Sequence, residues 1–369
     1  MKNLGRTKSF WLRAVATAAT LVALAALAGA EAPMYRTPYG RFPATLISVM
    51  RSRELLDNPG VAGYYERLFA KTGGMDQNYI FDRSFRVFRF KPNLTWQHDL
   101  VTTNSFGMIG PECSLRKPPH TRRVALLGGS LSAGHMIQAN QTFGALLESR
   151  LNTMRPSAPS QRFEILNFAC VAYTLTQILD VAIEDAPRFE PDVYMVDVNE
   201  LGVFRQWDRH LVQVVQRGID PKYQFLREVL RQSGASAGDD DLTLYGKLAP
   251  YRMQVLRETL VELQSAVARQ HAALIVILVP SIEAGELSKR RVQGIRPLLA
   301  SLHITVVDLL DTFEGVLDTA RLAAYRGDVH PNAEGNAMLF RNLYAKLRAQ
   351  PEAWAALMGS AAESAGSTQ

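Results

Sequence analysis

Five short runs of apolar residues recur from residue 124 onwards, each followed by a longer stretch of mixed polar and apolar character. The runs are nearly continuous, without the alternation of polar and apolar positions that marks a strand with one face in water. Continuous runs of this length are typical of parallel strands that are covered on both faces. They predict strands at Val124–Leu127, Phe163–Phe168, Val193–Val198, Ala273–Val279 and Ile304–Leu309.

Apolar residues at helical spacing fill the stretches between these runs. They predict helices at Thr142–Met154, Thr176–Pro187, Met253–His271 and Glu286–Ser301, and a last helix from about Pro331 to Arg348. Alternating strands and helices indicate a doubly wound α/β fold. We therefore expect a mostly parallel five-stranded sheet flanked by helices, with ligands at the carboxyl ends of the strands. An insert, 204–248, separates the third and fourth strands, and its middle, 232–241, predicts an exposed flexible loop.

The first 30 residues have the composition of a targeting segment. Residues 1–13 are basic, residues 14–30 are uncharged and rich in Ala, Leu and Val, and Ala28-Gly29-Ala30 fits a small-x-small cleavage site. This layout predicts a cleaved secretory signal peptide, or alternatively an uncleaved membrane anchor, because 17 weakly apolar residues are at the lower limit for spanning a bilayer. We expect an exported protein, periplasmic or secreted, or one anchored in the inner membrane.

Composition divides the rest of the chain into three parts. Residues 31–121 hold many Pro, Gly, Tyr and Arg residues and predict an N-terminal extension, in which Phe85–Phe90 suggests a strand. Residues 122–350 carry the alternating strands and helices and predict the main domain. Residues 351–369 predict a flexible tail.

Net charge excludes one class of partner. The formal charge is +6, and the basic residues of the first 30 account for four of these charges, which leaves +2 for the remainder. No cluster of Lys and Arg interleaved with aromatic residues occurs, so we expect no nucleic-acid binding. Cys113 and Cys170 are the only cysteines, and no Cys-x-x-Cys or His/Cys cluster indicates a metal. The two thiols either form a disulfide in an oxidising compartment or stay unpaired and buried.

A serine and a histidine far apart in the sequence carry the candidate chemistry. Ser130 follows a predicted strand and the pair Gly128-Gly129, at the start of the next helix. Glycine permits the tight turn that exposes a hydroxyl there. Asp328 and His330 precede the last helix, and residues two apart in extended backbone face the same way. Nucleophile, base and orienting acid together predict serine-based acyl transfer. Taken singly, the first motif also occurs as a plain loop or phosphate cradle, and the second as helix capping.

These motifs resemble those of the SGNH/GDSL hydrolases. The first block is Gly128-Gly129-Ser130, and the last is Asp328 with His330. Between them, segment 165–173 is similar to the family's Asn-x-x-x-x-Gly block through Asn167 and Ala172, and segment 191–201 is similar to its Asn block through Asn199. Residues 104–107, Asn-Ser-Phe-Gly, resemble the Asn-Ser-x-Gly preface of exported bacterial members. The resemblance covers roughly residues 100–350.

The resemblance implies an oxyanion site made by the N–H groups of Ser130 and Ala172 and the side-chain amide of Asn199. Three positions depart from the family pattern. Gly129 stands where Asp is commoner, and Ala172 stands where the family has Gly. Asp197 stands where Gly is common, and an acid near an oxyanion disfavours the developing negative charge unless it points away.

Two functions follow from the resemblance. The first is a serine ester hydrolase or O-acyltransferase acting on acyl esters, acetyl among them, of a small molecule or of envelope polysaccharide, without a cofactor. The second is a catalytically degenerate binding module in an envelope assembly, which the departures at Ala172 and Asp197 favour. A nucleotide-binding protein is disfavoured, because neither a P-loop nor a Gly-x-Gly-x-x-Gly run is present. His135, five residues after Ser130, is expected to lie away from the site and to be structural.

The export prediction has a direct test. We expect the mature native protein to begin near Glu31, since Ala28-Gly29-Ala30 precedes it, and to lie outside the cytoplasm. N-terminal sequencing of the native protein, after cell fractionation, measures this. An intact Met1 in a membrane fraction supports the anchor instead, and an intact Met1 in the cytosol contradicts export.

Overall fold

The computed structural model describes residues 34–37, 40–43, 78–96, 101–154, 161–205, 207–282, 286–324 and 328–359. The chain forms two units, Met1–Gly74 and Met75–Gln369. In the first unit the described residues are β1 (Met34–Thr37) and β2 (Gly40–Pro43), which pair antiparallel. The signal or anchor segment expected over residues 1–30 lies outside the described residues. Within the described part of the chain, every helix is too short or too polar to cross a bilayer.

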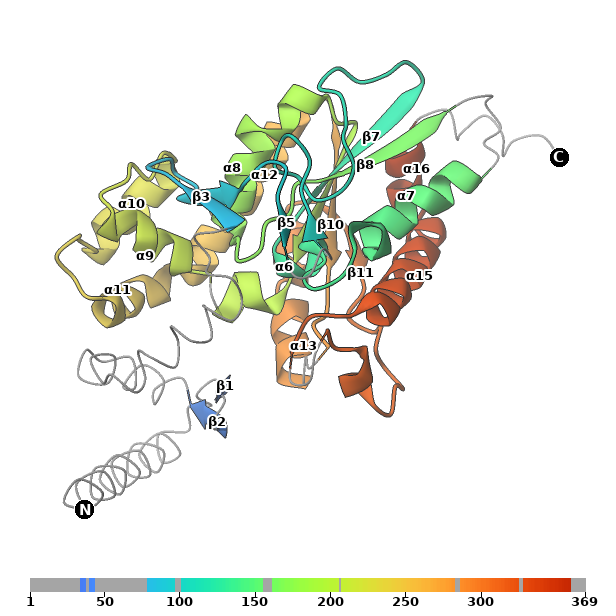
Figure 1. The fold of residues 1–369 in the computed structure, drawn as a ribbon. Coiled ribbons are helices and arrows are strands. Elements are labelled where there is room, and N and C mark those ends of the chain that lie inside the picture. Colours follow the sequence, from blue (N-terminus) through green and yellow to red (C-terminus); the bar gives the residue numbers. More distant parts are fainter. Residues whose placement is uncertain are drawn as a thin grey trace. The chain divides into compact units, whose positions relative to one another are not determined.

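A parallel sheet of five strands forms the centre of the second unit, in the order β11-β10-β9-β7-β8 (Figure 1). The predicted α/β fold and its five strands are confirmed. The strand order reverses between β7 and β9, because β8 lies on one side of β7 and the later strands on the other. Doubly wound sheets bind ligands at such a reversal, outside the carboxyl ends of the strands. The strands are β7 (Thr121–Leu127), β8 (Arg162–Asn167), β9 (Val193–Val198), β10 (Ala273–Leu278) and β11 (Thr305–Asp308).

Helices cover both faces of this sheet. Along β7, Val124 and Leu126 belong to one apolar core, while Ala125 and Leu127 belong to the other. Both faces are therefore buried, which explains why the strand sequences are continuously apolar. The first core is shared with α7 (Phe143–Thr153), α15 (Ala333–Ala349) and α16 (Pro351–Met358), and the second with α8 (Leu175–Glu184), α12 (Arg252–Arg269), α13 (Glu286–Gln293) and α14 (Arg296–Ser301).

One predicted helix is divided. The stretch Glu286–Ser301 forms α13 and α14, because Gly294 ends the first helix and Pro297 occupies the first turn of the second. Proline lacks the N–H that would continue the helix but suits a helix start. Shorter helical turns also occur: α6 (Ser130–Ala133), 3₁₀ turns at Ala139–Gln141, Ala186–Phe189, Ala249–Tyr251 and Thr319–Leu322, and a π-helical turn at Leu201–Arg205.

The insert 204–248 is mostly helical. It contains α9 (Arg209–Gln216), α10 (Gln224–Ser233) and α11 (Asp241–Leu248), which lie together beside α8 and α12 (Figure 1). Each helix buries a leucine completely in the apolar core: Leu211, Leu226 and Leu244. The predicted exposed loop is present between α10 and α11.

The boundary expected near residue 121 is wrong, because residues from Met75 onwards belong to the compact unit that holds the sheet. The hairpin of β3 (Tyr79–Phe81) and β4 (Phe88–Phe90) packs aromatic rings into the core of that unit. The strand suggested over residues 85–90 is shorter than predicted, since Val87 adopts a left-handed conformation that turns the chain. A second antiparallel pair joins β5 (Thr95–Trp96) to β6 (Val101–Thr102).

The flexible tail expected over residues 351–369 is also wrong in its first half. Residues 351–358 form α16, and Ala353 and Leu357 are completely buried. The helix packs against α15, where the Trp354 and Tyr344 rings meet edge to face at 6.1 Å. Apolar residues on one face hold this helix to the core, so burial outweighs the tendency of a chain terminus to fray.

Both cysteines are free. Cys170 is buried and Cys113 is half-buried, so of the two possibilities left open by the sequence the unpaired one is found. Burial raises the pKa of the Cys170 thiol and of the Cys113 thiol, the latter to about 11. Neither thiol is therefore ionised to a useful extent at neutral pH, and both pack as small apolar groups.

His210 is a buried histidine that links the hairpin, α8 and α9. Its Nε2 lies 2.5 Å from the Phe85 carbonyl oxygen, and its Nδ1 lies 2.7 Å from Thr176 Oγ1. A carbonyl only accepts, so Nε2 carries the hydrogen and Nδ1 accepts from the threonine. Burial lowers the pKa of His210 to about 4, against the opposing bond to Phe85.

This shift predicts how stability depends on pH. The unfolded chain takes up a proton at His210 below about pH 6.5, whereas the folded chain resists it until about pH 4. Stability therefore falls as the pH drops through this window, by about 2 kcal/mol between pH 7 and pH 5 from this residue. Urea unfolding at both pH values should show a smaller loss for His210→Gln than for the wild type. Equal losses in the two proteins would contradict the assignment.

Candidate active site

The nucleophile turn follows β7. Gly128 and Gly129 lead into α6, where Ser130 is the first residue and is half-buried. A Cβ on Gly128 would lie 2.8 Å from the Cβ atoms of Asp197 and Ser132, so only glycine fits there. The helix is a single turn, because Gly134 adopts a left-handed conformation that ends it. The serine is therefore presented at a sharp bend, with a backbone N–H that has no acceptor inside the helix.

Ser130, His330 and Asp328 form a continuous chain of hydrogen bonds. His330 Nε2 lies 2.7 Å from Ser130 Oγ, and His330 Nδ1 lies 2.7 Å from Asp328 Oδ1. Because a carboxylate only accepts, Nδ1 carries the hydrogen and Nε2 is left to accept from the serine hydroxyl. The structure thus brings together the three residues that the sequence singled out for catalysis, in the order required for proton transfer.

The loop that carries the acid and the base is held at several points. Asp328 Oδ1 also accepts from the N–H of Val329 at 2.8 Å. The carbonyl of Val329 accepts from the N–H of Ile282, after β10, and that of His330 accepts from Ala324. Both side chains are mostly buried, with exposed fractions of 15% for His330 and 5% for Asp328. The imidazole is therefore fixed by the backbone as well as by the carboxylate.

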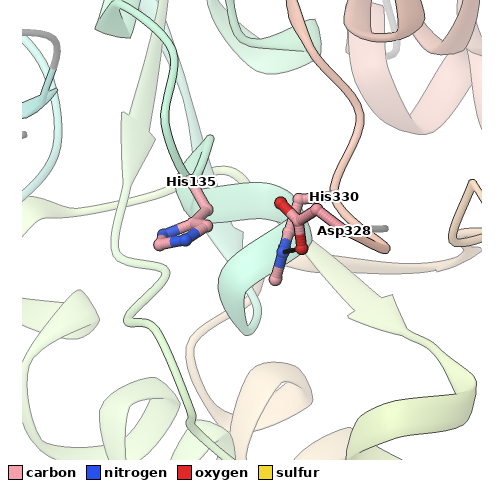
Figure 2. A group of neighbouring side chains, drawn as sticks. All are labelled: His135, Asp328 and His330. Carbon is pink, nitrogen blue, oxygen red and sulfur yellow. Dashed lines mark hydrogen bonds and ion pairs between the residues drawn. The ribbon is translucent and has the colours of Figure 1, made fainter. Parts of the chain in front are cut away.

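His135 lies beside His330, which corrects the expectation that it is remote from the site. The ring centroids are 4.6 Å apart, at 55° between the planes (Figure 2). The expectation assumed a longer helix, whereas α6 ends after one turn and the left-handed Gly134 and Met136 fold the chain back. Burial, and then the neighbouring His330, lower the pKa of His135 to about 4, against the opposing effect of Asp328. The second imidazole is thus neutral at neutral pH.

These three side chains are also the candidate metal ligands among the described residues. One ligand atom each from His135, Asp328 and His330 lies within 4.8 Å of the others (Figure 2). Both ring nitrogens of His330 are engaged, one by Asp328 and one by Ser130. A metal would have to break one of these bonds, so the arrangement suits proton transfer better than metal binding.

Asn199 and Asp197 come from the end of β9, next to the nucleophile turn. The Asn199 side-chain amide donates from Nδ2 to Asp197 Oδ1 at 2.9 Å, and its Oδ1 accepts from the N–H of Gly202 at 3.0 Å. Asp197 Oδ2 accepts from Ser132 Oγ at 2.9 Å. Asp197 is only 2% exposed, and burial raises its pKa to about 6 despite these hydrogen bonds.

The loop after β8 supplies the remaining sequence candidates. Cys170 donates its N–H to the carbonyl of Gly128, and a Cβ on Gly129 would meet the Tyr173 carbonyl at 3.3 Å, so this loop borders the nucleophile turn. Asn167 donates from Nδ2 to the Ser132 carbonyl at 2.8 Å, which braces α6. Ala172 has a φ of +70°, the left-handed region that favours glycine.

Residues 104–107, which resemble the Asn-Ser-x-Gly preface, form a turn that contacts the hairpin. Asn104 Oδ1 accepts from the N–H groups of Phe106 and Met108, which closes a turn. Gly107 has a φ of +79°, and a Cβ there would lie 2.9 Å from the carbonyl of Phe90. The segment follows β6 and packs against the end of β4, and glycine is required at position 107 by both its conformation and this contact.

Sequence reasoning missed two side chains of the site. His135 was placed too far away, and the only signal to the contrary was Gly134, which predicts an early helix end. Asp197 was treated as an obstacle to an oxyanion, whereas both of its oxygens are engaged by Ser132 and Asn199. Such a partnership depends on the contact between β7 and β9, which no local pattern indicates.

Solved structures of an acetylxylan esterase, of TesA and of a lipolytic protein of the G-D-S-L family are similar to this chain. A catalytic mutant of the acetylxylan esterase Axe2 from Geobacillus stearothermophilus is 16% identical, with 61% of this chain and 94% of that chain covered and a TM-score of 0.42. TesA is 14% identical, with 62% and 99% covered and a TM-score of 0.39. A lipolytic protein of the G-D-S-L family from Veillonella parvula is 12% identical, with 61% and 97% covered and a TM-score of 0.38. No protein-family model and no curated protein matches the sequence.

Likeness at this level assigns no activity to this chain. The five-stranded sheet and the contacts of Ser130, His330 and Asp328 are properties of this chain's own structure.

The left-handed conformation of Ala172 leads to a prediction about stability. Glycine adopts this conformation without the Cβ clash, so Ala172→Gly should raise the free energy of unfolding by up to about 1 kcal/mol. Chemical denaturation measures the difference. The matched control is Ala145→Gly inside α7, which should lower stability by about 1 kcal/mol because glycine is a poor helix former. Equal destabilisation by both changes would show that Ala172 is not strained.

Proposed function

We propose that this protein is a serine ester hydrolase of the SGNH type. The observation that carries the proposal is the pair of 2.7 Å contacts that joins Ser130 Oγ to His330 Nε2 and His330 Nδ1 to Asp328. A serine hydroxyl is a weak nucleophile until a base removes its proton, and this arrangement provides the base together with a group that fixes its tautomer.

The reaction proceeds in two halves. Ser130 Oγ bonds to the carbonyl carbon of the ester while His330 Nε2 takes the hydroxyl proton, and the carbonyl oxygen becomes an oxyanion. The intermediate collapses by breaking the bond to the leaving oxygen, which receives the proton from Nε2 and departs as an alcohol. Water then bonds to the acyl carbon while His330 Nε2 takes one of its protons. The second intermediate collapses by breaking the bond to Ser130 Oγ, which receives that proton, and the carboxylic acid departs. Asp328 stabilises the imidazolium in both halves.

The oxyanion site of the proposal consists of the N–H groups of Ser130 and Ala172 and the Asn199 amide. The three groups follow β7, β8 and β9, and their loops adjoin at the carboxyl edge of the sheet. One amide hydrogen of Asn199 is used by Asp197, and an amide carries a second one. A donor of this kind is typically worth about 3 kcal/mol of transition-state stabilisation.

The substrate we propose is an ester of a short acyl group, such as acetyl, on a carbohydrate or small molecule. The methyl group of Ala172 at the proposed oxyanion site supports a short acyl group, because it takes up space that glycine would leave. If a second alcohol replaces water in the second half-reaction, the same residues perform acyl transfer. Export, as predicted from residues 1–30, would place the enzyme among envelope polysaccharides.

The alternative of a degenerate binding module has less support than it had from the sequence. It rested on Ala172 and on the acid at position 197. Asp197 is held by Asn199 and Ser132 rather than left unpaired at the site, and Ala172 keeps its backbone N–H. The bonds among Ser130, His330 and Asp328 favour an activated nucleophile over a binding module.

Hydrolysis of p-nitrophenyl acetate by purified variants tests the proposal. Ser130→Ala should lower kcat at least about a thousandfold, because removal of the nucleophile leaves only residual catalysis. Asp328→Asn should lower kcat by about 10²–10⁴-fold with little change in KM, since an amide favours the wrong tautomer of His330 and no longer stabilises its charged form. The exposed Ser301→Ala, at the end of α14, is the matched control and should retain full activity.

Circular dichroism and thermal unfolding would establish that each variant is folded. A folded Ser130→Ala protein with near wild-type turnover would rule out the proposed nucleophile. Full activity in Asp328→Asn, with Ser130 and His330 essential, would mean that the enzyme works as a dyad.

A further inference from the structure

Asp197 is a buried acid that the mechanism above does not use. It occupies β9, whose six residues are all buried, and its side chain turns toward the nucleophile turn after β7. A charged group in such a place is costly unless its oxygens are fully hydrogen-bonded. Apolar packing alone therefore does not explain why an acid is buried at this position.

The contacts of Asp197 reach two parts of the proposed site. Oδ1 accepts from the Asn199 amide at 2.9 Å, and Oδ2 accepts from Ser132 Oγ at 2.9 Å. Burial raises the pKa of Asp197, and the hydrogen bonds from Asn199 and Ser132, together with the nearby backbone N–H groups of Gly129 and Ser132, favour the ionised form. Each oxygen of the carboxylate therefore accepts a hydrogen bond from a side chain of the site.

Asn199 is held from both ends by this arrangement. Its Nδ2 donates to Asp197, and its Oδ1 accepts from the N–H of Gly202, in the π-helical turn that follows β9. The two bonds fix the plane of the amide and so the direction of its second hydrogen. An oxyanion donor lowers a barrier only if it is aimed before the reaction begins.

We infer that Asp197 is a positioning residue that orients the Asn199 amide toward the oxyanion and locks it to the nucleophile turn. The inference rests on the proposed function. It replaces the view that an acid at this position weakens the site. The carboxylate accepts from Asn199 on one side and from Ser132 on the other, and these hydrogen bonds favour its charged form. Close packing also fits this role, because a Cβ at position 128 would lie 2.8 Å from the Cβ of Asp197, so only glycine lets the turn approach this acid.

A double-mutant cycle with Asn199 tests the inference. Asp197→Ala removes both acceptors, whereas Asp197→Asn keeps one oxygen that can hold the Asn199 amide. We expect kcat for p-nitrophenyl acetate to fall about a hundredfold in the first variant and about tenfold in the second, with KM within about threefold of wild type. In an Asn199→Ala background, the same changes should cost less than about threefold, because there is no amide left to orient.

A boronic acid inhibitor, which mimics the tetrahedral intermediate, supplies an independent measurement. Its inhibition constant should rise in step with the loss of kcat, whereas the KM for the ester should not. Thermal unfolding identifies the folded variants, and if Asp197→Ala does not fold, Asp197→Asn carries the cycle alone.

Three results would overturn the inference. They are unchanged kcat in the Asp197 variants, a loss that persists undiminished in the Asn199→Ala background, and a change confined to KM. Each of these results can be obtained only with an active wild-type enzyme, so it would overturn the inference without contradicting the proposed function. A wild type without Ser130-dependent turnover would overturn the proposed function, and this inference with it.

Discussion

Burial of both faces of the central sheet is the constraint on which the site depends. The strands β7, β8 and β9 are covered by helices on either side, so their register is fixed and their carboxyl ends meet at one edge. Ser130, Ala172 and Asn199 each follow one of these strands. The sheet thereby places groups that are tens of residues apart in the sequence next to one another, even where no hydrogen bond joins them directly. The strand order reverses between β7 and β9, which is where doubly wound sheets bind their ligands.

The base reaches this edge from the far end of the domain. His330 lies 200 residues after Ser130. Backbone hydrogen bonds hold its loop to Ile282, which follows β10, and to Ala324, which precedes the loop in the chain. The acid that orients it comes from the same loop, so acid and base move as one piece. The nucleophile turn is braced separately, by Asn167 and by Asp197. The loop of Asp328 and His330 and the nucleophile turn are thus held separately, and the hydrogen bond between His330 and Ser130 links them.

Sequence patterns predicted those parts that depend on local chemistry. Continuous apolar runs located the five strands, and Gly128-Gly129-Ser130 with the pair Asp328 and His330 located the residues that form the hydrogen-bonded chain. Features that depend on contacts between segments far apart in the sequence could not be predicted. The hairpin before β7 and the helix α16 were assigned outside the domain because their apolar residues find their partners only in the folded core. His135 and Asp197 were misjudged because their neighbours lie on other elements.

The most direct test of the central claim is the site of reaction with a fluorophosphonate, which reacts much faster with an activated serine than with other residues. Peptide mass spectrometry of the treated protein should find a single adduct, on the peptide that contains Ser130, and His330→Ala should slow its formation by at least about a hundredfold. Absence of an adduct on folded protein, or an adduct on another residue, would contradict the account.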